Sequence, residues 1–379
     1  MARAHPRIVE LVRASVDAAR AGRAQRMDGE GTVPAAHYVD PARTQAEVDG
    51  LFARLPIPLA CSAELADPGT TIVRELGGVS LLLVRGLDGV ARGFRNACRH
   101  RGTRLVREDC RTKAFVCPYH AWTYDLDGRL RHLPCADAFP SLDFSRHGLA
   151  PIHVEERHGL VWASLSGATG EVRAWLGALD DELASLSLDT HVVTRRVARE
   201  QEGNWKLLME AFLEGYHVRI LHKTTVGPFF VDQASIAQRE GVHVRHASPR
   251  RAAVEASDPS TLPLRELATF GYSLFPCTVL IAHPDWISHI VVQPRGPSRF
   301  LWCHSQLVPT GIASPEAEAH LRRSFDLIEG AVFQKEDLFV IGEMQAGLAS
   351  EANTELTFGR LESAILWFHE AVDAAIGPH

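Results

Sequence analysis

The chain has 379 residues, of which 46% are hydrophobic and 23% charged, and its net charge is −6 at pH 7. This length accommodates about two domains with substantial cores. The acidic balance, without a lysine or arginine block, argues against a nucleic-acid-binding protein, and no apolar run approaches the roughly 18 residues that a membrane helix requires. The seven cysteines follow no regular spacing, which is typical of a reducing compartment. We therefore expect a cytoplasmic protein without a membrane or nucleic-acid partner.

The first 37 residues combine arginines with an amphipathic pattern. Ile8, Leu11, Val12 and Val16 recur at helical spacing. No long apolar segment is present that would make this region a signal peptide. We therefore predict that residues 1–37 form a helical segment that packs on the C-terminal domain.

Residues 38–165 alternate short apolar runs with turn sequences. The runs are strand-sized, and Gly77-Gly78, Asp88-Gly89 and Asp127-Gly128 are typical of hairpin turns. This alternation predicts a compact antiparallel β domain.

Four residues of this domain have the spacing of a metal site. They form the pattern Cys98-x-His100 followed by Cys117-x-x-His120. Two thiolates can bind one iron and two neutral imidazoles the other, which is the ligand set of a Rieske [2Fe–2S] cluster. A Cys₂His₂ zinc site uses the same ligand types, but its ligand pairs usually enclose two or more residues. The spacing therefore favours the Rieske cluster.

The region 166–379 mixes strand and helix patterns and is predicted to be a second domain. A helix is expected around 205–217, and strand-like runs follow between 271 and 308. Two late helices are expected over 315–347, with a break, and over 362–375. We see no internal repeat in this region.

A second candidate metal site lies in the segment from Glu214 to His222. Two histidines and a distant carboxylate can form the facial triad of a mononuclear non-haem iron(II), which leaves positions open for O₂ and substrate. His217 and His222 are five residues apart, so both reach one metal only where the helix is distorted or ends. Alternatively, they are simply two histidines on a partly buried helix.

Two segments together resemble the Rieske non-haem iron oxygenase α subunits. One is the motif within 98–120, and the other is Asn204-Trp205-Lys206 followed by Glu214-x-Tyr-His217-x₄-His222. The resemblance covers roughly residues 35–350. It implies an α+β protein with an N-terminal antiparallel β Rieske domain, residues 38–165, and a C-terminal catalytic domain of antiparallel sheet and helices, residues 166–379.

The resemblance also implies iron ligation by His217, His222 and a carboxylate on a late helix. The segment from Glu336 to Gly347 is similar to the family pattern for that helix and places the carboxylate on Asp337, with Glu336 as the alternative. Glu214, at a position that is often aspartate, resembles the branch with carnitine- and choline-type oxygenases.

These features imply the terminal oxygenase of a multicomponent system. A separate NAD(P)H-dependent reductase, with or without a ferredoxin, would supply electrons, because the chain has no dinucleotide-binding glycine motif. The oxygenase would use O₂ to hydroxylate, dihydroxylate or demethylate a small organic molecule, and aromatic hydrocarbon catabolism is one expected role.

The resemblance further implies a homotrimer in which the cluster of one subunit meets the catalytic iron of the next. Glu214 is then expected to relay electrons by linking a cluster histidine of the neighbour to His217. The alternatives are a non-catalytic Rieske-type electron carrier, which needs only about 100 residues, and a zinc-binding interaction protein.

Overall fold

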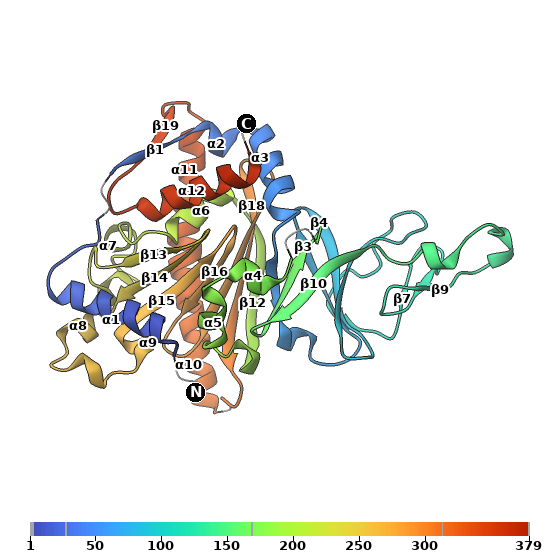
Figure 1. Cartoon of the computed structure of the whole chain (residues 1–379), viewed down its shortest axis with the longest axis horizontal. Coiled ribbons are helices and arrows are strands. Elements are labelled where there is room, and N and C mark those ends of the chain that lie inside the picture. The colour runs from blue at the N-terminus through green and yellow to red at the C-terminus, as the bar shows by residue number, and fades with distance from the viewer. Residues whose placement is uncertain (1–3, 27–28, 168–169, 313, 378–379) are drawn as a thin grey trace. The chain divides into compact units, whose positions relative to one another are not determined.

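The computed structural model describes residues 4–26, 29–167, 170–312 and 314–377. The chain folds into two compact units, Phe52–Trp175 and the combination of Met1–Leu51 with Leu176–His379 (Figure 1). Residues 1–3 and 27–28 of the expected N-terminal segment lie outside the described residues. No helix in the described part of the chain is long and apolar enough to cross a membrane.

The unit Phe52–Trp175 consists mainly of antiparallel strands. Its larger sheet has the order β2-β11-β10-β5-β4-β3-β6, and its smaller sheet the order β7-β8-β9. The strands are β2 (Ile57–Cys61), β3 (Thr70–Leu76), β4 (Val79–Arg85), β5 (Ala91–Arg95), β6 (Cys110–Arg111), β7 (Phe115–Val116), β8 (Thr123–Tyr124), β9 (Leu130–His132), β10 (Pro151–Arg157) and β11 (Leu160–Ser164). Gly77 and Gly78 join β3 to β4, and their φ angles of 54° and 80° suit a two-residue hairpin turn. The predicted antiparallel β domain is confirmed.

The larger unit is organised around a seven-stranded antiparallel sheet of order β12-β18-β17-β16-β15-β14-β13. These strands are β12 (His191–Glu202), β13 (Ile236–Glu240), β14 (His243–Pro249), β15 (Ala268–Leu274), β16 (Thr278–Ala282), β17 (Ile287–Pro294) and β18 (Arg299–Pro309). Every residue of the central strand β17 is buried. A strand buried at every position has both faces covered, and Figure 1 shows helices of this unit around the sheet.

Helices from distant parts of the sequence pack on this sheet. α1 lies against β14 and β15, α6 against β17, and α11 against β12. The helices of this unit are α1 (Pro6–Arg20), α2 (Ala36–Val39), α3 (Pro41–Glu47), α5 (Leu179–Ala184), α6 (Trp205–Ala211), α7 (Val218–Leu221), α8 (Arg251–Glu255), α9 (Leu264–Leu267), α10 (Pro315–Phe325), α11 (Leu338–Leu348) and α12 (Ser363–Ile376), and α4 (Val172–Leu176) spans the boundary between the units. The α+β class expected from the sequence is confirmed.

Three elements differ from the sequence-based expectation. The N-terminal segment contains a strand as well as helix, because β1 (Gly31–Pro34) pairs with β19 (Glu355–Phe358). The helix expected around 205–217 ends at Ala211, and the chain turns before α7. The expected break in the late helix is instead a π-helical segment, η8 (Asp326–Asp337), which continues from α10 into α11.

Candidate metal centres

The two halves of the Cys-x-His and Cys-x-x-His pattern form loop tips of closely similar geometry. The carbonyl of Cys98 accepts a hydrogen bond from Gly102 N, and the carbonyl of Cys117 accepts one from Ala121 N. Gly102 and Ala121, each four residues after its cysteine, have positive φ angles of 78° and 56°. Each cysteine N–H is also bonded five residues ahead, Cys98 to Thr103 O at 2.9 Å and Cys117 to Trp122 O at 2.8 Å. The paired loops therefore present their side chains from equivalent turns.

The four side chains divide by burial as well as by chemistry. Cys98 and Cys117 are buried free thiols, whereas His100 is half-buried and His120 exposed. The two imidazole rings lie 4.8 Å apart between centroids, and His100 stacks on Trp122 at 4.9 Å. Desolvation raises the pKa of the Cys98 thiol, so its thiolate would need a bound cation. A buried sulfur pair beside an accessible imidazole pair fits a two-iron cluster with one iron held by each pair.

Tyr124 adds a contact to this site that sequence reasoning missed. Its hydroxyl lies 3.2 Å from Cys98 Sγ and also accepts a hydrogen bond from Arg99 N. The residue is buried on β8, and its place beside Cys98 depends on the pairing of distant segments rather than on a local motif.

In the larger unit, a single helical turn separates the two candidate histidine ligands. His217 is the N-cap residue of α7 and His222 its C-cap residue, and their rings lie 5.1 Å apart. Glu214 accepts hydrogen bonds from the backbone N–H groups of Tyr216 and His217, which favours a turn here over a continued helix. The short helix thus lets two side chains five residues apart face one point.

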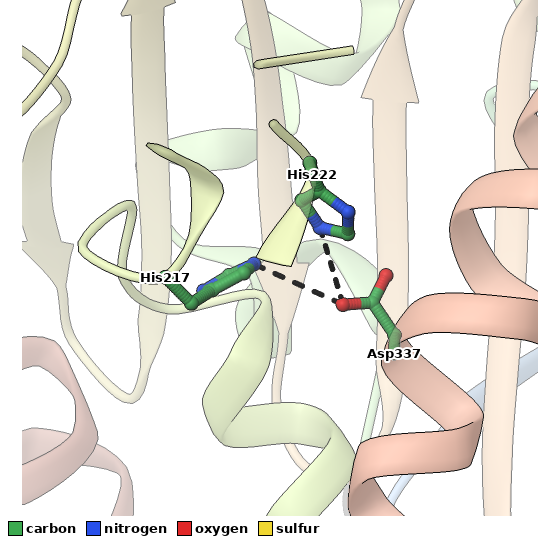
Figure 2. A group of neighbouring side chains, drawn as sticks. All are labelled: His217, His222 and Asp337. Carbon is green, nitrogen blue, oxygen red and sulfur yellow. Dashed lines mark ion pairs between the residues drawn. The ribbon is translucent and has the colours of Figure 1, made fainter. Parts of the chain in front are cut away.

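Asp337 completes this group from the end of η8. Figure 2 shows its carboxylate facing both imidazoles from one side, with Oδ1 3.2 Å from His222 Nε2 and 3.9 Å from His217 Nε2. One candidate ligand atom from each of the three residues lies within 4.8 Å of the others. Asp337 Oδ1 is buried and has no well-aligned hydrogen-bond donor among the described residues. An unsatisfied buried oxygen facing two ring nitrogens is what a metal ion would fill.

A second carboxylate holds the other nitrogen of each histidine. Glu214 Oε1 bonds His217 Nδ1, and Glu336 Oε2 bonds His222 Nδ1 at 2.7 Å. Thr225 also donates its hydroxyl to Glu336 at 2.7 Å. A carboxylate on Nδ1 keeps the proton there and leaves the Nε2 lone pair free for a metal. The sequence had offered Glu336 only as a substitute for Asp337, whereas here the two acids contact different atoms of His222.

The charge balance of the group favours a cation. Burial acts to lower the pKa of His217 and of His222, but the adjacent carboxylates outweigh it and the pKa of each is raised. Three carboxylates, from Glu214, Glu336 and Asp337, therefore surround two imidazoles. Such an arrangement gains from a divalent metal, which would replace the protons that the histidines otherwise attract.

A cavity of about 520 Å³ opens beside these residues within the larger unit. His217, His222 and Asp337 line it, together with the aromatic side chains Phe212, Tyr216, Phe229, Phe230, Phe333 and Trp367. A mainly apolar cavity with a few polar groups at one place is typical of a small-molecule site.

Comparisons with known proteins identify the family of each part of the chain. The family described as "Ring hydroxylating alpha subunit (catalytic domain)" matches residues 188–377, and the Rieske [2Fe-2S] domain family matches residues 56–143. The carnitine monooxygenase oxygenase subunit of Escherichia coli (strain K12) is 30% identical over 333 residues, which cover 84% of each chain. The glycine betaine monooxygenase oxygenase subunit of Chromohalobacter salexigens is 32% identical over 199 residues, covering 52% of this chain and 44% of that protein.

Solved structures show the same fold. A quaternary ammonium Rieske monooxygenase in complex with L-carnitine has a TM-score of 0.80 at 23% identity, with 91% of this chain and 96% of that chain covered. Naphthalene 1,2-dioxygenase from Rhodococcus sp. has a TM-score of 0.79 at 20% identity, with 98% of each chain covered. The curated relatives do not support the expected role in aromatic hydrocarbon catabolism. The family carries a Rieske cluster and a mononuclear non-haem iron, and both residue groups described above fit these cofactors. The chain therefore belongs to the Rieske non-haem iron oxygenase α subunits, the oxygenase components of multicomponent systems.

Proposed function

We propose that His217, His222 and Asp337 hold the mononuclear iron and that Cys98, His100, Cys117 and His120 hold the Rieske cluster. The observation that carries the first assignment is the pairing of each histidine Nδ1 with its own carboxylate, which leaves both Nε2 atoms facing Asp337. The second rests on the two matching loop tips with their buried thiols.

When bound, the cluster and the iron would supply the redox chemistry in which O₂ oxidises a substrate and electrons from a separate reductase or ferredoxin complete the reduction of O₂. The chain's own residues bind the substrate, orient the metal ligands and exclude water from the cavity. Glu214 and Glu336 fix the tautomers of His217 and His222, and the aromatic wall of the cavity holds an organic molecule beside Asp337.

The relatives suggest the reaction for which this cavity is used. Those named above are monooxygenase components for carnitine and glycine betaine, and a further relative, 23% identical, is a choline monooxygenase of Spinacia oleracea. We therefore propose monooxygenation of a small quaternary ammonium compound. Aromatic side chains of the cavity such as Tyr216 and Trp367 suit this chemistry, because ring faces attract such cations. The enzyme is proposed to act in the cytoplasm.

The iron assignment is tested by Asp337→Ala. Loss of the carboxylate should reduce the iron content from about three to about two atoms per chain and abolish turnover, while the visible spectrum of the cluster is retained. Glu343→Ala, an exposed acid on α11, is the matched control and should keep all the iron. An Asp337→Ala protein with full iron content would show that the ligand is another residue.

Glu336→Ala separates the two neighbouring acids. This change should weaken iron binding by roughly 10–100-fold, because His222 loses the partner that orients it, without removing a ligand. Iron retention measured against a chelator series distinguishes this graded loss from the complete loss expected of Asp337→Ala.

A further inference from the structure

Arg250 is a half-buried cationic side chain that lines the cavity and has no carboxylate partner among the described residues, whereas Arg323, the other arginine of the cavity wall, is exposed. Arg250 follows the end of β14, and it shares the cavity wall with Phe229, Phe230 and Thr269. Its guanidinium lies 6.0 Å from the Phe229 ring centroid and 5.8 Å from that of Phe230. The cation is therefore held beside aromatic rings of the site rather than among surface charges.

The hydrogen bonds of Arg250 leave most of its donors unused. Nη1 donates to Thr269 Oγ1 at 3.3 Å, and no carboxylate oxygen of the described residues lies within 4.0 Å of its guanidinium. A guanidinium has five N–H donors in a planar fork that matches a carboxylate. Apart from the bond to Thr269, the N–H donors of Arg250 have no side-chain acceptor among the described residues.

Nearby acids do not compensate for the charge. Glu266 and Asp285 act on Arg250 only through space, and Asp285 is bonded to His320 at 2.9 Å. Burial lowers the pKa of Arg250, and this loss of solvation exceeds the favourable effect of the two acids. Placing an incompletely paired cation in an apolar cavity costs free energy, which an anionic ligand would offset.

We propose that Arg250 binds a carboxylate group of the substrate and thereby determines which molecules the oxygenase accepts. The proposal rests on the proposed function, since it concerns the cavity beside the iron site. It distinguishes among compounds of the kind that the relatives act on. Carnitine and glycine betaine carry a carboxylate, whereas choline carries an uncharged hydroxyl group that cannot balance the guanidinium. A purely cationic molecule would meet a like charge at Arg250.

Matched pairs of ligands test the assignment. Glycine betaine and choline share a trimethylammonium group and differ in carboxylate against alcohol, and benzoate and benzyl alcohol repeat the comparison without a quaternary nitrogen. Dissociation constants are measured by calorimetry on the intact protein with both metal centres loaded. We expect the wild type to bind at least one acid more tightly than its alcohol, by roughly 10–150-fold, as for hydrogen bonds between charged groups.

Two substitutions then locate the effect. Arg250→Gln removes the charge but can still donate to Thr269, and it should abolish the preference for the acid. Binding of the uncharged benzyl alcohol should stay the same, and binding of the cationic choline should become tighter, because the like charge at Arg250 is gone. Arg250→Lys keeps the charge and should restore part of the preference. Arg251→Gln is the matched control, because Arg251 lies outside the main cavity and bonds the carbonyls of Pro228 and Phe230. Thermal unfolding of each variant verifies that the fold is retained.

The outcomes separate this proposal from the proposed function. Acids that bind the wild type no better than alcohols, including the case in which none of the four binds, overturn the role of Arg250. The same holds if Arg250→Gln leaves the preference intact or if Arg251→Gln removes it equally. None of these results affects the iron content of Asp337→Ala, so the assignment of the metal ligands is tested separately by that measurement.

Discussion

At the scale of single residues, both metal sites depend on side chains that are not ligands themselves but form hydrogen bonds to the ligand residues. Glu214 and Glu336 each bond one Nδ1, and the hydroxyl of Tyr124 lies 3.2 Å from Cys98 Sγ. Partners of this kind orient ligands and tune the metal they hold. The chemistry of each site therefore extends beyond its ligand atoms.

Tyr124→Phe tests this at the cluster. Loss of the hydroxyl removes a hydrogen-bond donor from Cys98 Sγ, which makes the reduced cluster less favourable, so the midpoint potential should fall. One hydrogen bond of about 0.5–1.5 kcal/mol corresponds to roughly 20–60 mV for a one-electron couple. The measurement is a spectroscopic redox titration.

Tyr119→Phe is the control for the Tyr124 experiment. Tyr119 is exposed, its ring lies 3.8 Å from that of His120 between centroids, and its hydroxyl accepts a hydrogen bond from Arg101. It has no hydrogen bond to a cysteine sulfur among the described residues. Its loss should leave the potential within a few millivolts. Equal shifts in both variants would mean that the Tyr124 hydroxyl does not act on Cys98.

At the scale of elements, α6 connects the sheet to the iron site. Asn204 caps the helix through Oδ1 and Lys206 N at 3.0 Å, and Gly203, with φ +122°, precedes it. A Cβ at Gly203 would lie 2.5 Å from Ile341 Cγ2 on α11, so only glycine fits this junction. The Asn-Trp-Lys segment thus anchors the helix that leads to Glu214.

Lys206 fixes α6 through a fully buried ion pair with Glu47 of α3. Its Nζ lies 2.7 Å from Glu47 Oε1, and both side chains have no exposed surface. Lys206→Met should destabilise the protein by about 3–5 kcal/mol, because it leaves the Glu47 carboxylate buried and short of a cation. Arg43, whose Nε lies 3.3 Å from Glu47 Oε1, still balances part of the carboxylate's charge, so we expect a loss of stability near the lower end of this range. Denaturant unfolding measures the change.

The double variant Lys206→Met with Glu47→Gln completes the cycle. Removing both charges should recover a large part of the lost stability, because no carboxylate is then left without its lysine and Arg43 keeps its ion pair with Asp373 at 2.5 Å. Trp205 Nε1 also donates to Glu47 Oε2 at 2.8 Å and can still donate to the glutamine oxygen. A double variant as unstable as the single one would show that packing, not charge, determines the cost.

The sequence predicted those parts of the site whose geometry is local. The cluster pattern lies within 23 residues, and loop tips of this spacing leave little freedom for Cys98 and His120. The end of α6 was not predictable from periodicity, because the Glu214 carboxylate competes for the backbone N–H groups of the following turn. The apolar pattern is the same on either side of that turn.

The neighbouring acids Glu336 and Asp337 show a second limit. In a regular α-helix, successive residues are rotated by about 100° around the axis, so only one of the two acids would face the histidines. The wider π-helical turn of η8 has a smaller angle per residue, and here both carboxylates reach His222, at different nitrogens. The positions of Arg250 and Tyr124 in their sites could not be predicted from a local motif, because the residues that they contact are distant in the sequence.

At the scale of the whole molecule, the proposed electron path depends on assembly. We propose that the chain forms a homotrimer, as the resemblance in its sequence implies, and that Glu214 accepts a hydrogen bond from a cluster histidine of the neighbouring subunit. The carboxylate has the capacity for this bond. Oε2 accepts two backbone N–H groups and Oε1 accepts His217 Nδ1, which leaves a lone pair on Oε1.

Glu214→Gln tests the bridge. The variant should retain both metal centres and reduction of the cluster by the external donor, because Glu214 is not an expected ligand. Electron transfer to the catalytic iron should be slower by roughly 10–100-fold, since a neutral amide is a weaker acceptor and has only one oxygen for these donors. The rate of cluster reoxidation is measured in a single turnover on pre-reduced protein.

Glu362→Gln controls for the loss of a negative charge near Glu214. Glu362 acts on Glu214 through space and accepts a hydrogen bond from Gly359 N, but it makes no hydrogen bond to His217 in the described structure. Its reoxidation rate should match the wild type. A wild-type rate in Glu214→Gln would eliminate the bridge. Light scattering under assay conditions measures the oligomeric state of the active enzyme. Full activity in a monomer would eliminate electron transfer between subunits, because no histidine of a neighbouring subunit would then be available to Glu214.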